Sequence, residues 1–258
     1  MAKDKRQRTK NLQVFSTLKR TQRRNLLTLF ATGLLFWTSL ASLLPTLPLY
    51  VNRVGGTPQQ IGIVMGAFAI GLLLFRPWLG RIADQKSRTI VLILGTAVAA
   101  IAPLGFLFVK SIPLLFLLRA FHGISIAAFT TAYSALVVDL SPINQRGELI
   151  GYMSLVQPLG VAIGPAVGGL IQSESGFAAL FILAAVLGGA SFLGAIQIKE
   201  PSKLEIQQNT PITSPESPAT DTQFWRLLFS ARLRIPALVL LLIGSAFGAL
   251  STFIPLYI

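Results

Sequence analysis

Six apolar segments in this chain are long enough to cross a lipid bilayer, and a seventh runs to the last residue. They cover residues 25–51, 59–79, 89–109, 113–139, 148–172, 177–198 and 235–258. A helix of about 20 apolar residues crosses the hydrocarbon layer, which is about 30 Å thick. Only 12% of the residues are charged, whereas an average soluble domain carries about 25%. The pattern therefore predicts an all-α integral membrane protein.

The basic residues indicate which ends of the spans face the cytoplasm. Of the 22 Lys and Arg residues, nine lie in the first 24 positions. Most of the others fall in the segments 80–88, 140–147 and 199–232, which lie on the same side as the N-terminus. The opposite side holds only Arg53 and Lys110. Because loops rich in Lys and Arg remain in the cytoplasm, we expect a multi-pass protein of the cell (inner) membrane with a cytoplasmic N-terminus.

The composition argues against several classes of function. The net charge of +13 is compatible with a nucleic-acid partner, but the charge flanks apolar spans and no module that reads nucleic acid accompanies it. The chain has no cysteine, which excludes disulfides, thiolate metal sites and a cysteine nucleophile. The sequence contains no evident metal-binding cluster, no Ser-His-Asp set and no phosphate-binding loop. We expect no nucleic acid, no metal, no cofactor and no enzymatic activity.

We expect four parts along the chain. These are a basic cytoplasmic segment (1–24), a six-helix bundle (25–198), a cytoplasmic linker (199–232) and the seventh span (233–258). The first span is too long for a secretory signal and no small-residue cleavage site follows it, so it is retained. The linker is rich in Pro, Ser, Thr and Gln, which is typical of a flexible connection. Its segment 224–234 alternates apolar and basic residues and is expected along the membrane surface.

Two weak internal repeats indicate a doubled architecture. "RPWLGRI" (76–82) resembles "GPAVGGL" (164–170), and these stretches lie in spans 2 and 5, which run in opposite directions. "TLPLYV" (46–51) resembles "FIPLYI" (253–258) and relates the end of span 1 to the end of span 7. Inverted and parallel repeats of this kind are common in transporters. Spans 1 and 7 would then open two equivalent halves.

The stretch "GRIADQKSR" (80–88) is predicted to form a charged loop between spans 2 and 3. Asp84 is expected to pair with Arg88 or to accept from a helix N-terminus, where the dipole favours negative charge. Ser87 is a plausible N-cap of span 3. Asp139, at the end of span 4, lies at the same depth and can pair with Arg76, Arg81 or Arg88. The alternative is a solvated turn with no specific pairs.

Span 4 carries two titratable residues deep in an apolar run. Arg119 is expected to face a wet cavity or a partner, because a buried charge is costly; the alternative is that its side chain reaches the outer interface. His122 lies three residues further on and shares the helical face. It is the only histidine and has an ordinary pKa near neutrality. The alternative for His122 is a packing role.

Span 5 contains a stripe of small residues. Gly160, Gly164 and Gly168 recur every four residues, and Gly169 widens the stripe. Small residues allow helix backbones to approach closely in lipid, and Pro165 should bend the helix because it removes a hydrogen bond. Two sets of polar or aromatic residues are candidates for a cavity lining: Gln157 in span 5, and Trp37, Ser39 and Ser42 in span 1.

Taken together, these motifs resemble the N-terminal half of a major facilitator superfamily carrier. "GRIADQKSR" is similar to that family's loop motif G-x-x-x-D-R-x-G-R, with Gly80, Asp84 and Arg88 matching. "RAFHG" is similar to the helix 4 motif R-x-x-Q-G, in which Arg119 and Gly123 match and histidine replaces glutamine. "GVAIGPAVGG" matches the helix 5 antiporter motif G-x-x-x-G-P-x-x-G-G in full. "LLPTLPLY" resembles the helix 1 motif of drug:proton antiporters.

The resemblance implies the six-helix N-terminal bundle of a 12-helix carrier, together with one helix of the second bundle. It implies that Asp84, Arg88 and Asp139 form a gating charge cluster and that Arg119 takes part in proton coupling. It also implies that the span 5 helix packs against the second half. Membrane lipid, a small-molecule substrate, protons and a C-terminal bundle, in cis or in trans, are the implied partners.

The expected function is proton-coupled efflux of small organic molecules by alternating access. Because the last apolar run is interpreted as helix 7, residues 1–258 alone are expected not to transport unless they meet a complementary bundle. The alternative is a truncated, non-transporting membrane protein or a half-carrier that needs a partner.

Overall fold

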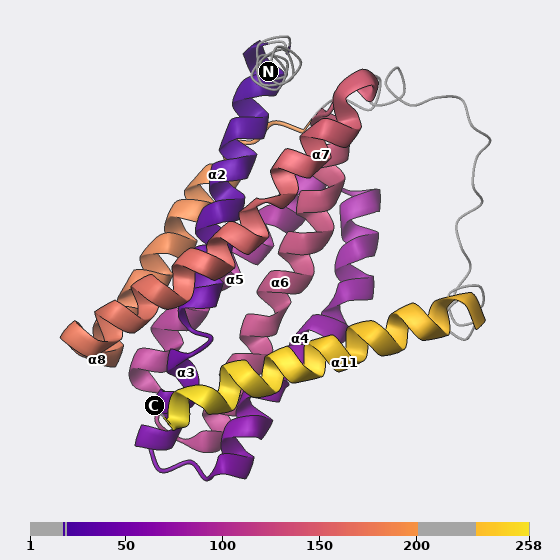
Figure 1. Ribbon diagram of the computed structural model, residues 1–258. Helices are drawn as coiled ribbons and strands as arrows, with labels where there is room; N and C mark the ends of the chain where they lie inside the picture. Colours follow the sequence, from indigo (N-terminus) through magenta and orange to yellow (C-terminus); the bar gives the residue numbers. More distant parts are fainter. Residues whose placement is uncertain (1–17, 19, 201–230, 258) are drawn as a thin grey trace, which may run out of the picture.

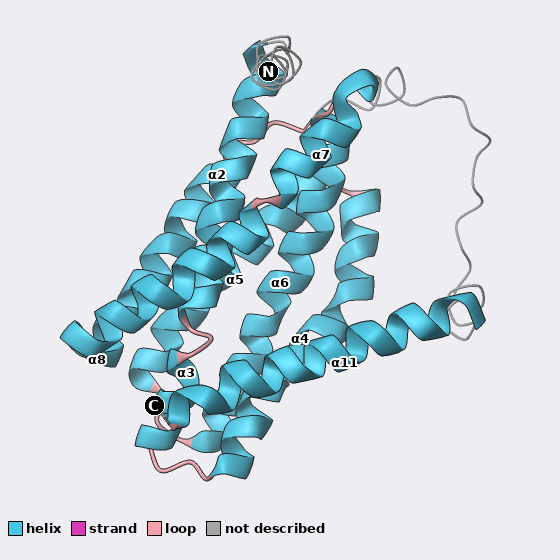
Figure 2. Cartoon of the chain, in the orientation of Figure 1, coloured by secondary structure: helices cyan, strands magenta, loops and turns pink. Residues whose placement is uncertain are grey.

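The computed structural model describes residues 18, 20–200 and 231–257, and within these ranges every regular element is helical (Figures 1 and 2). The α-helices are α2 (Arg20–Ser42), α3 (Thr46–Arg53), α4 (Pro58–Gln85), α5 (Arg88–Phe108), α6 (Ile112–Leu140), α7 (Arg146–Ser154), α8 (Val156–Ala195) and α11 (Ala231–Phe253). Two short 3₁₀ helices, η1 (Ile143–Gln145) and η2 (Ile254–Leu256), complete the set. The predicted all-α membrane fold is confirmed.

The described residues contain six segments that are long and apolar enough to cross a membrane. One of them, Ile143–Ala195, is 53 residues long and includes two of the predicted spans. The backbone reverses inside α8 at Gly176, where φ is +81° and ψ is −179°, a region open to glycine alone. Figure 1 shows the two arms of α8 meeting at this reversal. Spans 5 and 6 are therefore separate arms joined without a loop.

Proline residues explain two breaks in the helices, one between α2 and α3 and one between α7 and α8. Pro45 and Pro48 follow the end of α2, and Pro158 follows the end of α7. Proline lacks the N–H that would bond to the carbonyl four residues before it, so the helical ladder is broken just upstream. The chain resumes as α3 and as α8. The repeat of "TLPLYV" at "FIPLYI" has a similar break, because α11 ends at Phe253 and η2 begins at Ile254.

The prediction of a charged loop over residues 80–88 is wrong for most of that stretch. Helix α4 continues to Gln85, and α5 begins at Arg88, so only Lys86 and Ser87 form the connection. Hydropathy falls where the charges begin, but charged residues do not stop a helix. The Ser87 side chain accepts from the Ile90 N–H at 3.3 Å, which confirms Ser87 as the N-cap of α5 and fixes the turn there.

The bundle is held by a few helix pairs. Helix α2 packs mainly against α8, α4 against α6, and α5 against both α6 and α8. Helix α11 runs across the lower part of the bundle in Figure 1 and is almost entirely exposed. Large apolar side chains such as Leu73 and Trp78 of α4 are also exposed, as expected for a surface in contact with lipid.

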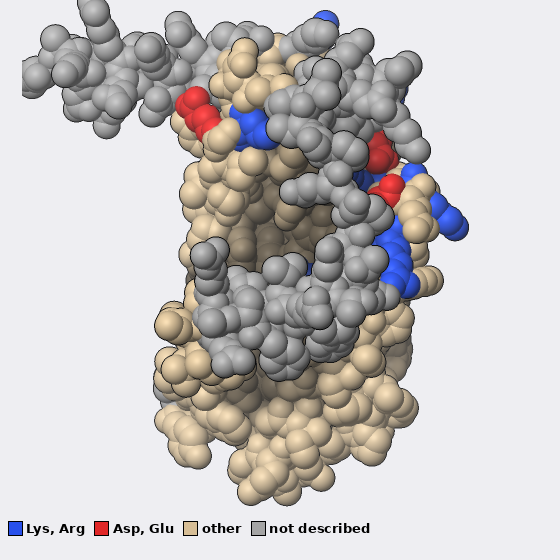
Figure 3. All heavy atoms as spheres, turned by 90° about the vertical axis from the view of Figure 1, so that its right-hand side faces the viewer, with Lys and Arg blue, Asp and Glu red and all other residues tan. Residues whose placement is uncertain are grey.

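Charged residues gather toward one end of the bundle. In Figure 3 the blue and red residues lie near the upper end, the end at which α2 begins in Figure 1, and the lower part of this face carries neither colour. The loops between α4 and α5 and between α6 and α7 lie at this same end. The predicted linker and the segment 224–234 fall mostly outside the described residues, as does most of the basic segment 1–24.

Candidate functional site

The charge cluster predicted at the N-terminal end of the bundle forms in part. Arg88 of α5 and Asp139 of α6 make an ion pair, and the Arg88 guanidinium also donates to the Ala135 carbonyl at 3.3 Å. The side chain of Asp139 is only 6% exposed. Of the three arginines considered for Asp139, the structure thus selects Arg88. The pair joins the first turn of α5 to the last turn of α6.

Glu200 is part of this cluster, although nothing in the local sequence pointed to it. Its carboxylate accepts from the backbone N–H of Arg88 at 3.1 Å and of Thr89 at 3.4 Å, and from the Ser87 hydroxyl. A carboxylate at a helix N-terminus satisfies orphan N–H groups and complements the helix dipole. Glu200 therefore ties the chain beyond α8 to the start of α5. The Asn25 side chain donates to the Lys199 carbonyl at 3.0 Å and ties the same segment to α2.

Asp84 and Gly80 do not join the cluster. Asp84 is exposed and makes no ion pair with any described residue, because Arg88 pairs with Asp139 and the α5 N-terminus is capped by Glu200. The expected pairing of Asp84 with Arg88, or with that helix end, is wrong in this conformation. A side chain added at Gly80 would meet nothing within 4 Å. Both residues lie on the last turns of α4, on its open side.

Arg119 and His122 form a buried pair inside the bundle. The side chain of Arg119 is 2% exposed and that of His122 is fully buried. The Arg119 Nη1 lies 3.3 Å from the His122 Nδ1, as their spacing on one helical face predicted. The guanidinium sits over the Phe68 ring, 4.3 Å from its centroid. Such burial contradicts the alternative in which Arg119 reaches the outer interface.

The surroundings of this pair are aromatic rather than acidic. His122 meets the edges or faces of Phe68 at 5.7 Å and of Phe106 at 6.3 Å between ring centroids. The Nε atom of Arg119 and the Nε2 atom of His122 are buried without a hydrogen-bond partner among the described residues. A buried polar group without a partner is costly. The pair is therefore a strained spot in an otherwise apolar contact.

Next to this pair, α4 and α6 touch backbone to backbone. A Cβ at Gly123 would overlap the Phe68 carbonyl oxygen, and a Cβ at Gly71 would overlap the Ala120 carbonyl oxygen. Both positions require glycine, because a side chain there would overlap main-chain atoms of the facing helix, which cannot move aside as a side chain can. Gly123 belongs to the motif "RAFHG", whereas Gly71 had no distinguishing pattern in the sequence.

The glycine stripe of span 5 lies against α2. A Cβ at Gly164 would lie 2.7 Å from the Ala41 Cβ and 2.8 Å from the Thr38 carbonyl oxygen, and Gly160 and Gly168 are equally tight. Gly169 faces open space, and Pro165 lies in continuous helix. The implied contact of this helix with a second half is thus not made by the stripe, which is buried within the bundle.

The serines of α2 belong to helix packing and not to a cavity. Ser39 donates to the Ala184 carbonyl of the second arm of α8 at 2.7 Å, and Ser42 packs on Gly168. Both side chains are fully buried. The expectation that they line a cavity is therefore wrong, because α8 lies directly on this face of α2.

Trp37 and Gln157, by contrast, line two cavities. One, of about 240 Å³, includes Trp37, Thr130 and Gln157. The other, of about 410 Å³, includes Trp37, Gln157, Phe68 and Phe247. The prediction that Gln157 faces a cavity agrees with this placement. Phe68 connects the larger cavity with the buried Arg119–His122 pair, since its side chain lines that cavity and its ring also lies under the Arg119 guanidinium.

Comparison with known proteins places this architecture in a family. The sequence profile of the Major Facilitator Superfamily matches residues 29–258. The quinolone resistance protein NorA of Staphylococcus aureus is 27% identical over 170 residues, which cover 66% of this chain and 44% of NorA. Multidrug resistance protein 1 of Bacillus subtilis is 28% identical over 178 residues, or 69% of this chain and 46% of that protein. The chain spans about half the length of these curated relatives.

A solved structure has the same fold. It is a bacterial homolog of the human lysosomal transporter Spinster, in an inward-facing and unoccupied conformation, with a TM-score of 0.71 and 18% identity. The match covers 92% of this chain and 55% of that one. Sequence profile and fold agree with the resemblance drawn from the four motifs, and the chain belongs to the Major Facilitator Superfamily.

Proposed function

We propose that this bundle is part of a secondary active transporter that exports small organic molecules by alternating access, driven by protons. The relatives named for quinolone and multidrug resistance support a small-molecule substrate. The family supports transport rather than catalysis.

The observation that carries the proposal is that Phe68 both lines the cavity and contacts the buried pair. A substrate in the cavity of about 410 Å³ would lie against Trp37, Gln157 and Phe68. An aromatic and amide lining suits apolar molecules with a few polar groups. Arg119 lies over the Phe68 ring, so a substrate that moves this ring changes the surroundings of Arg119 and His122. That shared side chain is the proposed coupling element.

His122 is the proposed proton carrier. It is the only histidine in the chain, and its Nε2 is buried without a described partner. A proton on this ring adds a positive charge beside Arg119, which is unfavourable in the buried, apolar surroundings of the pair. Protonation would therefore favour a conformation in which the pair is hydrated, and this links the proton to the change of access.

The Arg88–Asp139 pair and Glu200 are proposed to hold one gate state. They join α5, α6 and the chain after α8 at a single end of the bundle. We expect a second bundle as well, because α11 supplies only Phe247 to the lining of the cavity and is itself almost entirely exposed. That bundle would be supplied in cis or in trans.

The decisive experiment measures export of a fluorescent quinolone in inverted membrane vesicles, with and without an imposed pH gradient. The protein tested carries this chain together with a second bundle. We expect accumulation that follows the gradient in the unaltered protein. In His122→Gln, accumulation should no longer depend on the gradient, while facilitated movement down the substrate gradient persists.

A matched control is Phe121→Leu, which alters the exposed neighbour of His122 and should leave coupling intact. Gradient-driven accumulation by His122→Gln would overturn the role of the histidine. Transport by residues 1–258 alone would overturn the need for a second bundle. Absence of movement for every compound in a toxic panel would favour the non-transporting alternative.

A further inference from the structure

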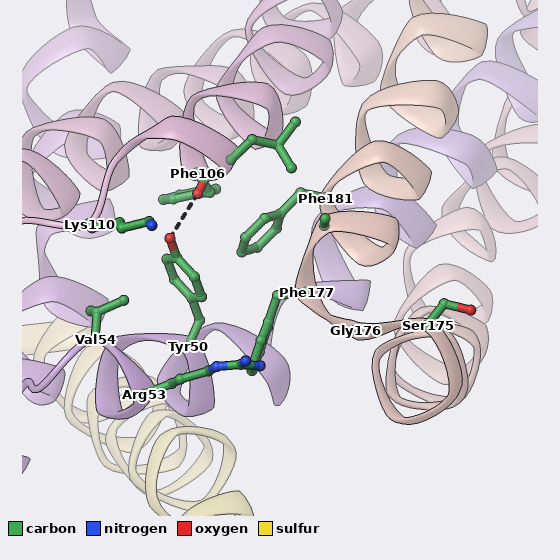
Figure 4. A pocket seen from close by; sticks show the side chains of 11 residues that line it. Tyr50, Arg53, Val54, Phe106, Lys110, Ser175, Gly176, Phe177 and Phe181 are labelled. Carbon is green, nitrogen blue, oxygen red and sulfur yellow. Dashed lines mark hydrogen bonds between the residues drawn. The ribbon is translucent and has the colours of Figure 1, made fainter.

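A cavity of about 600 Å³ lies at the end of the bundle opposite the charge cluster. The end of α3, the turn between α5 and α6, and the reversal at Gly176 enclose it. Figure 4 shows its aromatic and basic lining residues converging from these three segments. Six of them matter here: Tyr50, Arg53, Phe106, Lys110, Phe177 and Phe181.

The inner wall of this cavity is a fixed aromatic cluster. Tyr50 packs edge-on against Phe181, with ring centroids 5.0 Å apart, and Phe177 lies 5.3 Å from Tyr50. The Tyr50 hydroxyl lies 3.0 Å from both the Phe106 and the Val109 carbonyl oxygens, which it can reach as a donor. Since its only proton is used there, the wall offers apolar ring surface to an occupant.

Two exposed basic side chains line the cavity. Arg53 ends α3 and Lys110 lies in the turn between α5 and α6, and both line the cavity. Both are exposed, and neither makes an ion pair within the part of the chain that the structure describes. The Arg53 guanidinium lies 5.5 Å from the centroid of the Phe177 ring. Glu174 is in the neighbouring turn but does not line the cavity.

The cavity lies near the level at which the helices leave the membrane. Arg53, at the end of α3, and Lys110, in the turn between α5 and α6, are the only Lys or Arg residues at the helix ends on this side of the described bundle. They lie where membrane-spanning helices end, which is the level of lipid headgroups. Two residues far apart in sequence therefore bring their charges to one aromatic cavity at headgroup depth. Basic pockets between membrane-spanning helices on the cytoplasmic side bind anionic headgroups, and the same phosphate chemistry is open to two cations at this opposite end.

We propose that this cavity binds an anionic phospholipid. Its phosphate would lie between Arg53 and Lys110, and the upper part of an acyl chain would lie against Phe177 and Phe181. Arginine suits a phosphate because its planar N–H groups match the oxygens in pairs. A free phosphate offers the same oxyanion chemistry, but it leaves the aromatic wall unused. The proposal does not depend on transport.

Native mass spectrometry of the 258-residue chain tests it. The chain is released from vesicles of zwitterionic lipid that contain or lack a small share of phosphatidylglycerol, and retained lipids are counted. We expect one phosphatidylglycerol to be retained preferentially. The double variant Arg53→Gln with Lys110→Gln should weaken that binding about tenfold, because both charged contacts with the phosphate are lost.

Two controls keep the result interpretable. Lys86→Gln removes an exposed cation at the other end of the bundle and should bind lipid normally. Arg53→Lys keeps the charge but not the paired N–H groups, so it should bind less tightly than the unaltered chain and more tightly than the double variant, which separates loss of the site from loss of the fold. Equal retention by the double variant, equal retention of zwitterionic lipid, or displacement of the lipid by millimolar inorganic phosphate would each overturn the proposal.

Discussion

Two helix contacts in this bundle are built on glycine, yet they differ in what lies beside the glycines. The contact of α2 with α8 uses Gly160, Gly164 and Gly168 of the first arm, while Ser39 of α2 and Ser191 of the second arm form hydrogen bonds between the two helices. The contact of α4 with α6 uses Gly71 and Gly123, and its neighbours are Arg119 and His122 with unpartnered nitrogens. The first contact holds only neutral polar groups, of which the Thr32 hydroxyl alone lacks a hydrogen-bond partner among the described residues, and it suits a permanent contact. The second contact buries nitrogen atoms that have no hydrogen-bond partner among the described residues, so the cost of removing them from water is not compensated. It suits a contact that changes.

The largest expected effect comes from Gly123→Ala. Its Cβ would overlap the Phe68 main chain, which cannot turn aside, so α4 and α6 must separate. We expect a loss of about 3 kcal/mol in the free energy of unfolding, measured by denaturation in detergent micelles. Gly66→Ala on α4 is the matched control, since its Cβ meets nothing within 4 Å. Equal stability of the two variants would show that α4 and α6 are not in backbone contact.

Gly164→Ala should have a smaller effect, about 2 kcal/mol, because side-chain and main-chain atoms of α2 share the overlap. The same unfolding measurement applies. Gly169→Ala should be neutral or stabilising by up to about 1 kcal/mol, since alanine favours the helix and the position is open. If Gly169→Ala proved the more damaging of the two, the stripe would not face α2 as described.

Ser39→Ala should cost about 1 kcal/mol, because it removes the hydroxyl that donates to the Ala184 carbonyl. It should leave proton coupling unchanged, since the contact of α2 with α8 is the permanent one in this comparison. Unfolding measurements check the loss of stability, and gradient-driven export by the same preparation checks that coupling is unchanged. A loss of coupling with normal stability would place the moving contact at α2 instead.

Arg119→Met should change stability least, by less than about 1 kcal/mol in either direction. Removing a buried charge relieves its desolvation cost, and methionine fills much of the same volume. Export driven by a pH gradient should nevertheless fall strongly. Strong destabilisation without loss of coupling would mean that Arg119 supports the fold, and the contrast between the two contacts would fail.

Most of the fold follows from the sequence because hydropathy determines which segments can enter a bilayer. The spans, the N-cap at Ser87 and the shared face of Arg119 and His122 were predictable, and Arg88 was one of three arginines that could pair with Asp139. These features depend on local periodicity or on charges at one depth. The end of α4 was misjudged because apolar character stops near Gly80, whereas the helix continues to Gln85.

The parts that the sequence did not reveal depend on partners far away along the chain. Glu200 caps a helix that begins more than a hundred residues earlier, and no local pattern marks it. Gly71 is one of 22 glycines and becomes distinctive only when Ala120 is seen against it. The sequence favours a cavity lining for Ser39 and Ser42 because it does not show that α8 packs on this face of α2.

The reversal at Gly176 has a mechanical consequence. It joins the two arms of α8 by a single glycine with a positive φ, so no length of loop absorbs a displacement of one arm relative to the other at that end. The first arm is fastened to α2 by glycines and the second by Ser39 and by Ser191, which donates to the Thr32 carbonyl. Helix α2 and the two arms of α8 should therefore translate and tilt as one rigid body. Relative motion within the bundle should then occur at α4 and α6.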